Sequence, residues 1–308
     1  MKTKVETATP LASKTTLKIG GSAAFYLQPE SPEDILEAAA WAKQRGLTVF
    51  ALGNGSNALV SDKGWPGLVI DIGSRFDRIS WEGAAGSDAY DRREAVCQSG
   101  ASLSRLVREM VERKLRGIET LGGIPGTIGG ALVMNAGAYG HSISECATAV
   151  DFYDPAAGAI KTIDKDRLGA AYRRTVFSTM QAIILSGRFR FAVDDTGKAR
   201  EVYDDCLVKR KQKHPLELPN CGSVFKNPKP MSAGSLIEAS GLKGYRVGGV
   251  EVSTKHANFM VNRGHATAGD ARRLIAHVQK TVYEKRGVLL EPEVVFVGEF
   301  DDPLFSPE

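Results

Sequence analysis

Residues 121–140, LGGIPGTIGGALVMNAGAYG, decide what kind of fold this chain can have. Seven of the nineteen residues from Gly122 to Gly140 are glycine, where average usage of about 7% would supply one or two. Such density indicates a backbone that adopts positive φ angles or lets another molecule approach closer than a Cβ allows. Successive amides in such a turn form an anion site suited to a pyrophosphate. The stretch predicts a nucleotide-binding turn, with a ligand-free glycine turn as the alternative.

A second turn of the same kind precedes it. Residues 53–57, GNGSN, lie between two apolar segments that are predicted to be strands. Two such turns suggest one dinucleotide. The dinucleotide-binding fingerprint of the Rossmann fold needs a glycine turn between a strand and a helix, with an acidic residue about twenty positions later. Here the turn leads into Ala58, Leu59 and Val60, which are predicted to form a strand, so that fold is disfavoured.

Composition limits the class of protein. The chain has 308 residues, 43% of them apolar, which allows a sizeable core and two or three domains. The first thirty residues lack the charged n-region and apolar h-region of a signal peptide, and the sequence has no run of eighteen apolar residues. We therefore expect a cytoplasmic protein. The net charge of +4 suits small anionic ligands and is too small to indicate nucleic acid. Four cysteines without CxxC spacing suggest neither a metal site nor disulfides.

Periodicity and capping signals predict alternating helices and strands. A helix begins at Pro32, with Ser31 as N-cap, and ends at Gly46; a second follows Ser102 and has an apolar stripe from Leu103 to Val111. Further helices are expected at about 197–213, 235–239 and 268–285. Strands are expected at 23–27, 48–52, 68–72, 96–99, 150–153, 160–162, 183–186, 189–193, 223–225, 256–262, 288–290 and 294–297, and 75–90 is expected to be loop or hairpin.

A basic run, residues 209–214 (KRKQKH), ends the helix expected at 197–213 and precedes Pro215 and Pro219, which we interpret as a linker. Two interpretations of its charges stay open. Such a run can be a solvated helix face, or it can face an anion.

Taken in order, the motifs of this chain closely resemble those of the UDP-N-acetylenolpyruvoylglucosamine reductases, the MurB flavoenzymes of peptidoglycan precursor synthesis. The similar segments cover nearly the whole chain and are TTLKIGG at 15–21, residues 52–70, residues 117–140, YRRTVF at 172–177, CGSVFKNP at 221–228, residues 233–262 and LEPEVVFVGE at 290–299.

The resemblance implies an α+β fold. An FAD-binding region of the vanillyl-alcohol-oxidase type would consist of lobes 1–74 and 75–200, followed by an α/β substrate-binding domain at 201–287. A C-terminal strand at about 288–308 is a candidate to return to the first lobe. The two glycine turns would wrap the FAD pyrophosphate, which makes the following residues candidates for noncovalent FAD binding: Gly53, Asn54, Gly55, Ser56, Asn57, Gly123, Ile124, Pro125, Gly126, Thr127, Gly130, Ala131 and Gly137.

The reaction implied by the resemblance reduces the enolpyruvyl ether of UDP-N-acetylglucosamine to UDP-N-acetylmuramate, with NADPH as co-substrate. Hydride addition pushes negative charge onto the substrate carboxylate, which a guanidinium can stabilise. Arg173 matches the family's arginine, although Arg174 is adjacent. Ser223 matches the proton donor, for which Lys226 or His214 could resupply the proton. Glu293 matches the third catalytic residue and would need a raised pKa or a mobile proton.

Candidate substrate-binding residues by the same resemblance are Tyr172, Lys226 and Asn227, and no metal is expected. The short span between Tyr172 and Gly187 resembles the subgroup that lacks an extra substrate-closing loop. Lys18 stands where the family has arginine, and Cys221 replaces a commoner small residue. His141 follows the glycine stretch. Distant relatives attach flavin covalently through His or Cys, but noncovalent FAD is expected here.

The partners expected are the UDP-sugar enolpyruvyl ether and NADPH, without nucleic acid or membrane, and the chain is expected to be a monomer. One rival is another oxidoreductase of the same flavin fold, which would lack the constellation of Arg173, Ser223 and Glu293. Another is a non-catalytic nucleotide sensor that uses the same turns.

Overall fold

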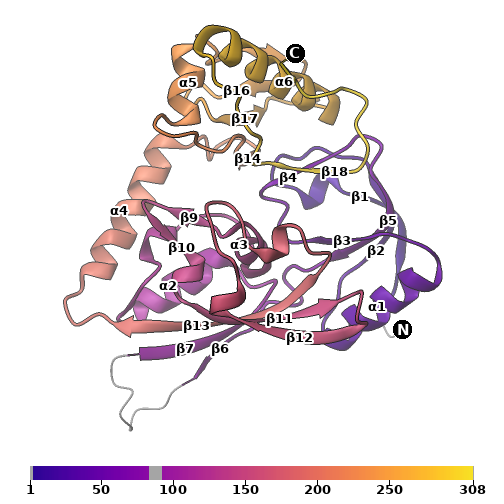
Figure 1. Cartoon of the computed structure of the whole chain (residues 1–308), viewed down its shortest axis with the longest axis vertical. Helices are drawn as coiled ribbons and strands as arrows, with labels where there is room; N and C mark the ends of the chain where they lie inside the picture. Colours follow the sequence, from indigo (N-terminus) through magenta and orange to yellow (C-terminus); the bar gives the residue numbers. More distant parts are fainter. Residues whose placement is uncertain (1–2, 83–91, 308) are drawn as a thin grey trace. The chain divides into compact units, whose positions relative to one another are not determined.

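The computed structural model of the chain describes residues 3–82 and 92–307 (Figure 1). It divides into two compact units. Unit 1 comprises residues 1–4, 27–54 and 70–210, and unit 2 comprises residues 5–26, 55–69 and 211–308. The three-part division expected from the sequence stays a prediction.

Unit 1 is built on a six-stranded antiparallel sheet. Its strands follow the order β12 (Ala159–Asp164), β11 (Ala147–Asp154), β13 (Ile183–Val193), β7 (Arg92–Gln98) and β6 (Ile79–Glu82), with β8 (Leu115–Arg116) paired to β13. Strands β12, β11, β13, β7 and β6 lie side by side in Figure 1. The unit also holds β3 (Val49–Leu52), the hairpin of β9 (Gly137–Ala138) with β10 (His141–Ser142), and 3-10 turns at 119–121, 143–145, 165–167 and 176–178.

Helices of unit 1 begin where the sequence supplies caps. In α1 (Pro32–Gln44) Ser31 and Asp34 form a reciprocal capping box. Ser102 caps α2 (Leu103–Glu112), whose expected apolar stripe is fully within the core. Thr127 caps α3 (Ile128–Met134), which ends at Asn135 in the left-handed conformation. The glycine stretch therefore leads into a helix that packs in the core of unit 1.

The strands of unit 2 belong to three sheets. Strand β1 (Glu6–Pro10) pairs with β2 (Ser22–Leu27), which neighbours β5 (Trp65–Asp71). Strand β4 (Ala58–Val60) pairs in parallel with β18 (Val295–Val297). A second sheet has the order β14 (Asn220–Ser223), β17 (Phe259–Asn262), β16 (Val250–Val252) and β15 (Arg246–Val247), and packs with α5 (Ala233–Ala239) and α6 (Ala268–Arg286). Strand β5 and helix α4 (Lys198–Lys213) each continue from one unit into the other.

Several sequence-based expectations are wrong in detail. The segments 183–186 and 189–193 form one strand, β13, because Gly187 is extended. Its glycine is required by space, since a Cβ there would lie 2.9 Å from Leu132 Cδ1. Residues 288–290 form no strand; the Leu290 carbonyl accepts a hydrogen bond from Gln279 instead.

Two other strands start or end elsewhere. Strand β17 begins only at Phe259, because residues 256–258 form a turn closed by the Phe259 amide on the His256 carbonyl. Strand β14 spans 220–223 rather than 223–225. Strand β1 was not expected, since it lies in the polar lead and is largely exposed. Part of the expected 75–90 hairpin, residues 83–90, lies outside the described residues.

The expected fold class is confirmed as α+β, and GNGSN leads into a strand as expected. Among the described residues, no helix combines the length and apolarity needed to span a membrane. All four cysteines are buried and unpaired, and the described part of the chain contains no cluster of metal-ligating side chains.

Candidate functional site

Within unit 1, Gly53 at the start of the first glycine turn lies against Thr127 of the second turn. A Cβ built on Gly53 would lie 2.5 Å from Oγ1 and 3.2 Å from Cγ2 of Thr127, so only glycine allows the first turn to approach the second this closely. Gly123 and Gly126 have φ angles of 75° and 130°, as expected for a turn that needs glycine. Turn residues far apart in the sequence thus form one feature.

The amides of the second turn divide into paired and unpaired groups. Ile128 and Gly129 donate to backbone carbonyls, and Gly130 donates to Thr127 Oγ1, so the first amides of α3 are already bonded. Within residues 3–82 and 92–307, no acceptor pairs with the amides of Gly123, Gly126 or Thr127. These three groups therefore fit the amide cradle that a pyrophosphate requires. The residues present fit an FAD at this turn.

We expect Gly53→Ala to lower both FAD content and thermal stability, because its Cβ would overlap Thr127 Oγ1. The space decides this result, since Gly53 does not have a left-handed φ. Thr127→Ala alone removes the N-cap of α3 and costs about 1 kcal/mol. The Gly53→Ala/Thr127→Ala protein should lose less than the sum of the two variants in melting temperature and bound FAD. Strict additivity would contradict the steric explanation.

Arg173 has an unusual backbone conformation, in the turn between Ala171 and Arg174. Its φ is 54°, in the left-handed region that non-glycine residues rarely adopt. Residues held in this region are frequent at functional sites. Nη1 donates to the Gly137 carbonyl at 3.2 Å, and the guanidinium lies 5.0 Å from the Tyr172 ring centroid. Arg174 is exposed and has no positive φ. The two adjacent arginines therefore differ in backbone conformation and in exposure.

The turn that carries Arg173 is fastened to the glycine stretch. Thr175 Oγ1 donates to the Leu132 carbonyl at 3.0 Å, and Asn135 Nδ2 donates to the Ala171 carbonyl at 3.0 Å. Both acceptor and donor belong to α3 or its C-cap. The position of Arg173 in unit 1 thus depends on the same helix that follows the nucleotide turn.

Ser223 and Glu293, seventy positions apart, come together in unit 2. The amide of Glu293 donates to the carbonyl of Val224, the residue after Ser223, at 2.7 Å. Asn57 Nδ2 donates to the Glu293 carbonyl at 3.1 Å, and the amide of Val295 donates to Asn57. The structure therefore joins both candidate catalytic residues of this unit to the end of the first glycine turn.

Gly222, which precedes Ser223, has a φ of 74°. A Cβ built on it would lie 3.8 Å from the Ser56 carbonyl oxygen, which brings a further residue of the first turn close to Ser223. Thr16, in the TTLKIGG segment, donates to the Asn220 carbonyl at 2.6 Å and also contacts Gly55. Three segments that are distant in sequence thus converge at Ser223.

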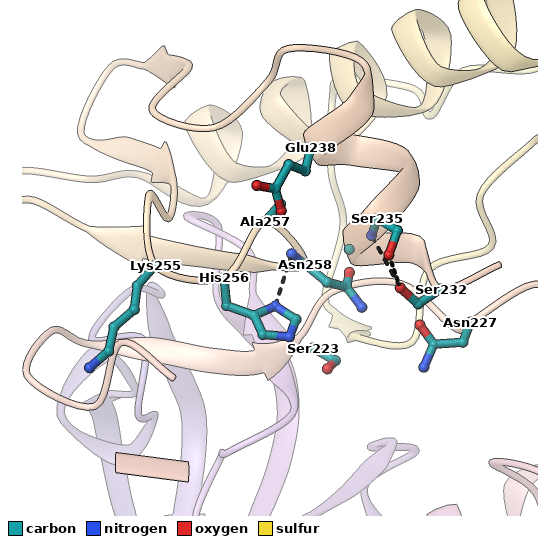
Figure 2. A pocket seen from close by; sticks show the side chains of 10 residues that line it. Ser223, Asn227, Ser232, Ser235, Glu238, Lys255, His256, Ala257 and Asn258 are labelled. Carbon is teal, nitrogen blue, oxygen red and sulfur yellow. Dashed lines mark hydrogen bonds between the residues drawn. The ribbon is translucent and has the colours of Figure 1, made fainter. Parts of the chain in front are cut away.

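A cavity of about 240 Å³ opens beside Ser223 in unit 2 (Figure 2). Its lining is almost wholly polar and comprises Ser223, Asn227, Ser232, Gly234, Ser235, Glu238, Lys255, His256, Ala257 and Asn258. Asn227 Oδ1 accepts from the amide of Ala233, which fixes its side chain at the start of α5. Hydroxyl, amide, imidazole, ammonium and carboxylate groups therefore line the cavity.

His256 has a defined tautomer in this cavity. Its Nδ1 accepts a hydrogen bond from the Asn258 amide at 3.2 Å (Figure 2). Burial and the nearby Lys243 hold the pKa of His256 below its usual 6.5. The imidazole is therefore neutral at pH 7, with Nδ1 as acceptor, so Nε2 carries the proton and is a donor.

Sequence reasoning placed Ser223 and Asn227 but missed Ser232, Ser235, Glu238, Lys255 and His256. All five belong to the motif at 233–262 or precede it by one residue. A strand was expected from His256 onward, so the turn at residues 256–258 was not predicted. Lys226 pairs with Glu291 and, like Glu293, is not among the described residues that line the cavity. His214 lies edge-on to His256, with ring centroids 5.5 Å apart. Tyr172 lies in unit 1 and is exposed.

His141, which follows the glycine stretch, pairs through Nδ1 with Glu145 at 2.9 Å and is exposed. Lys18 has a φ of 60°, and its ammonium donates to the Ser13 carbonyl. Cys221 is fully buried, which raises the pKa of its thiol to about 12 and makes it unreactive.

Comparison with known proteins agrees with this geometry. The model of an FAD binding domain matches residues 23–164, and the model of the UDP-N-acetylenolpyruvoylglucosamine reductase C-terminal domain matches residues 214–297. The chain is thus a flavoprotein with an FAD-binding region followed by a separate C-terminal domain.

Relatives that match nearly the full length of the chain belong to the same family. The UDP-N-acetylenolpyruvoylglucosamine reductase of Exiguobacterium sibiricum is 44% identical over 94% of this chain and 92% of its own length. That of Caldicellulosiruptor saccharolyticus is 41% identical over 96% and 93%. The crystal structure of the enzyme from Thermus caldophilus superposes with a TM-score of 0.79 at 30% identity, covering 97% of this chain and all of that one. This chain belongs to the UDP-N-acetylenolpyruvoylglucosamine reductase family.

Proposed function

We propose that this chain reduces UDP-N-acetylglucosamine enolpyruvate to UDP-N-acetylmuramate with NADPH, as a UDP-N-acetylmuramate dehydrogenase of peptidoglycan precursor synthesis. Family membership and the hydrogen-bonded pairing of the Ser223 and Glu293 segments carry this proposal. Bound FAD, once reduced by NADPH, would supply the hydride to C3 of the enolpyruvyl group. The cradle residues Gly123, Gly126 and Thr127 are proposed to bind the pyrophosphate of the cofactor.

Arg173 is proposed to bind the substrate carboxylate. Hydride addition to C3 makes the carboxylate end more electron-rich, and a planar guanidinium can donate two parallel hydrogen bonds to it. The left-handed φ and the hydrogen bond to Gly137 support a positioned guanidinium rather than a freely solvated one.

Ser223 is proposed to donate the proton to C2, and Glu293 to hydrogen-bond the carboxyl group as the product forms. A serine hydroxyl is a weak acid, so a neighbour must return its proton. Lys226 and His214 were the sequence-based candidates. Lys226 lies three residues after Ser223 and is ion-paired with Glu291. His256 joins them because it shares a cavity with Ser223.

The polar cavity beside Ser223 is proposed to hold part of the nucleotide sugar. The Nε2–H of His256 is the donor best suited to sugar hydroxyls or diphosphate oxygens, Asn227 lines the same cavity, and Lys255 supplies a positive charge that Glu217 partly offsets. Tyr172 and Lys226 stay proposed as further substrate contacts.

Two variants of His256 separate its two ring nitrogens. His256→Asn keeps an acceptor near Nδ1 for the Asn258 amide but cannot reach as far as Nε2, whereas His256→Gln keeps the reach. We expect His256→Asn to raise the KM for the UDP-sugar by roughly 10-fold, as expected for one lost hydrogen bond, and His256→Gln to raise it less. Steady-state kinetics and melting temperatures of both proteins provide the measurement. Equal KM values for the two variants would remove His256 from the binding role.

The whole proposal can be tested by one spectroscopic sequence. Purified protein should show the visible absorption of oxidised flavin, lose it on addition of NADPH, and regain it when the UDP-sugar enol ether is added. Mass spectrometry should then show a lactyl ether. Bleaching without reoxidation by the enol ether would favour another oxidoreductase of this fold. Absence of bleaching by NADPH would favour the sensor.

We also propose that the protein acts as a cytoplasmic monomer and that its FAD-binding lobes are 1–74 and 75–200, with substrate binding in 201–287. FAD is proposed to be noncovalent. Acid precipitation that left the yellow colour in the protein pellet would contradict this.

A further inference from the structure

One cation of the basic run is buried. On α4 the residues Tyr203, Cys206 and Arg210 form a buried stripe, and the neighbouring Lys209 and Lys211 are exposed. Arg210 is only 8% exposed, although charged side chains are rarely buried without a partner. Of the two interpretations left open by the sequence, solvation therefore does not apply to Arg210.

The buried stripe of α4 packs against the first part of the glycine turn. A Cβ built on Gly122 would lie 2.6 Å from Cδ2 of Tyr203, and one built on Gly123 would lie 2.9 Å from Leu207 Cδ2 and 3.2 Å from Arg210 Cδ. These residues all belong to unit 1. The close approach of α4 therefore favours glycine at both positions, independently of any ligand that binds the turn.

Arg210 donates its hydrogen bonds to the turn itself. Nε donates to the Gly122 carbonyl at 2.7 Å, and Nη2 donates to the Thr120 carbonyl at 3.1 Å. Its guanidinium also lies 5.7 Å from the Tyr139 ring centroid. Over the described part of the chain, no carboxylate forms an ion pair with Arg210. The positive charge beneath the turn is therefore not neutralised by the protein, and burial lowers the pKa of the guanidinium without discharging it.

The geometry of the peptide bond converts this contact into an orientation. In a planar trans peptide the C=O and the following N–H point in opposite directions. Because Arg210 holds the Gly122 carbonyl, the Gly123 amide points away from α4. That amide is one of the three that no described residue accepts. Arg210 thus fixes the direction of a donor that is available to a ligand.

We propose that Arg210 is a positioning residue for the FAD pyrophosphate, holding the Gly122–Gly123 peptide so that its N–H faces the phosphates and supplying an uncompensated positive charge behind the turn. This inference rests on FAD binding at the glycine turns. It assigns Arg210 no contact with the cofactor. Lys209, exposed on the same helix and paired with Asp205, should have no such role.

The test compares Arg210→Met, Arg210→Lys and the control Lys209→Met as full-length proteins. We expect Arg210→Met to raise the FAD dissociation constant by at least ~10-fold, to flatten its dependence on ionic strength, and to shift the ³¹P resonances of bound FAD. Arg210→Lys should restore the ionic-strength dependence and only part of the affinity, since an ammonium cannot reproduce the planar fork. Lys209→Met should match the wild type.

Two results would overturn the proposal. The first is a weaker FAD affinity accompanied by lower thermal stability of the apoprotein, with ³¹P resonances and salt dependence unchanged, which would make Arg210 a structural strut only. The second is an unchanged FAD affinity in Arg210→Met. If Arg210→Met does not fold, Arg210→Lys still tests the proposal. A positioning role predicts shifted ³¹P resonances of FAD bound to this variant, whereas a purely structural role predicts unchanged resonances. Failure of the wild type to bind FAD would instead refute the cofactor assignment.

Discussion

Ser223→Ala should leave reduction of the flavin by NADPH nearly unchanged and slow reoxidation by the enol ether at least ~10²-fold, which is typical for loss of a general acid. The reason is that the hydroxyl is proposed to act only after hydride transfer, when C2 needs a proton. Stopped-flow absorbance measures the two half-reactions separately. The first half-reaction in the same variant serves as its own control for folding and FAD binding.

Ser223→Cys gives a matched comparison, because a thiol keeps a transferable proton in nearly the same volume. It should retain more of the second half-reaction than Ser223→Ala does. The Glu293 amide donates to the Val224 carbonyl, a backbone bond that does not use the Ser223 side chain, so we expect both substitutions to preserve it. Equal losses in both half-reactions would show that Ser223 is structural.

Arg173→Met should slow the second half-reaction by roughly 10²- to 10³-fold, in the range observed when one donor that stabilises developing charge is removed. Methionine keeps much of the side-chain length while removing the charge and all donors. Because the guanidinium is proposed to act on the substrate carboxylate, which takes part only in the second half-reaction, flavin reduction by NADPH should change much less.

Arg174→Met is the matched control for this experiment. The residue is adjacent, carries the same charge and is exposed, but it lacks the left-handed φ of Arg173. We expect kcat and KM near those of the wild type. If the two variants lose activity equally, local charge rather than a positioned guanidinium is responsible, and the assignment of Arg173 is wrong.

Much of the local structure could be predicted. Ser31 and Pro32 mark the start of α1, and Ser102 marks the start of α2, because capping depends on residues within one turn of the chain. The ordered motifs were sufficient to indicate the family. In contrast, two strands were expected at 183–186 and 189–193, where β13 is one continuous strand, because Gly187 leaves room for Leu132 and forms no turn.

The candidate site was predicted only in part. Ser223, Asn227 and Glu293 were identified by motif, but His256 was not, because the pattern of residues 256–262 suggested a strand. The turn that points His256 into the cavity is stabilised by its own Nδ1 and by the Ser253 hydroxyl, and a hydrophobic pattern does not reveal such side-chain bonds.

By itself the sequence determined where the glycine turns lie, where helices α1 and α2 begin, and which family the chain belongs to. All three follow from residues that are neighbours in the chain. Only the tertiary structure decided that Gly53 meets Thr127, that Glu293 is bonded to the residue after Ser223, and that Arg210 rather than its neighbours is buried against the nucleotide turn. The physical reason is that close approach, desolvation and an uncompensated charge depend on groups brought together by folding, which no local pattern encodes.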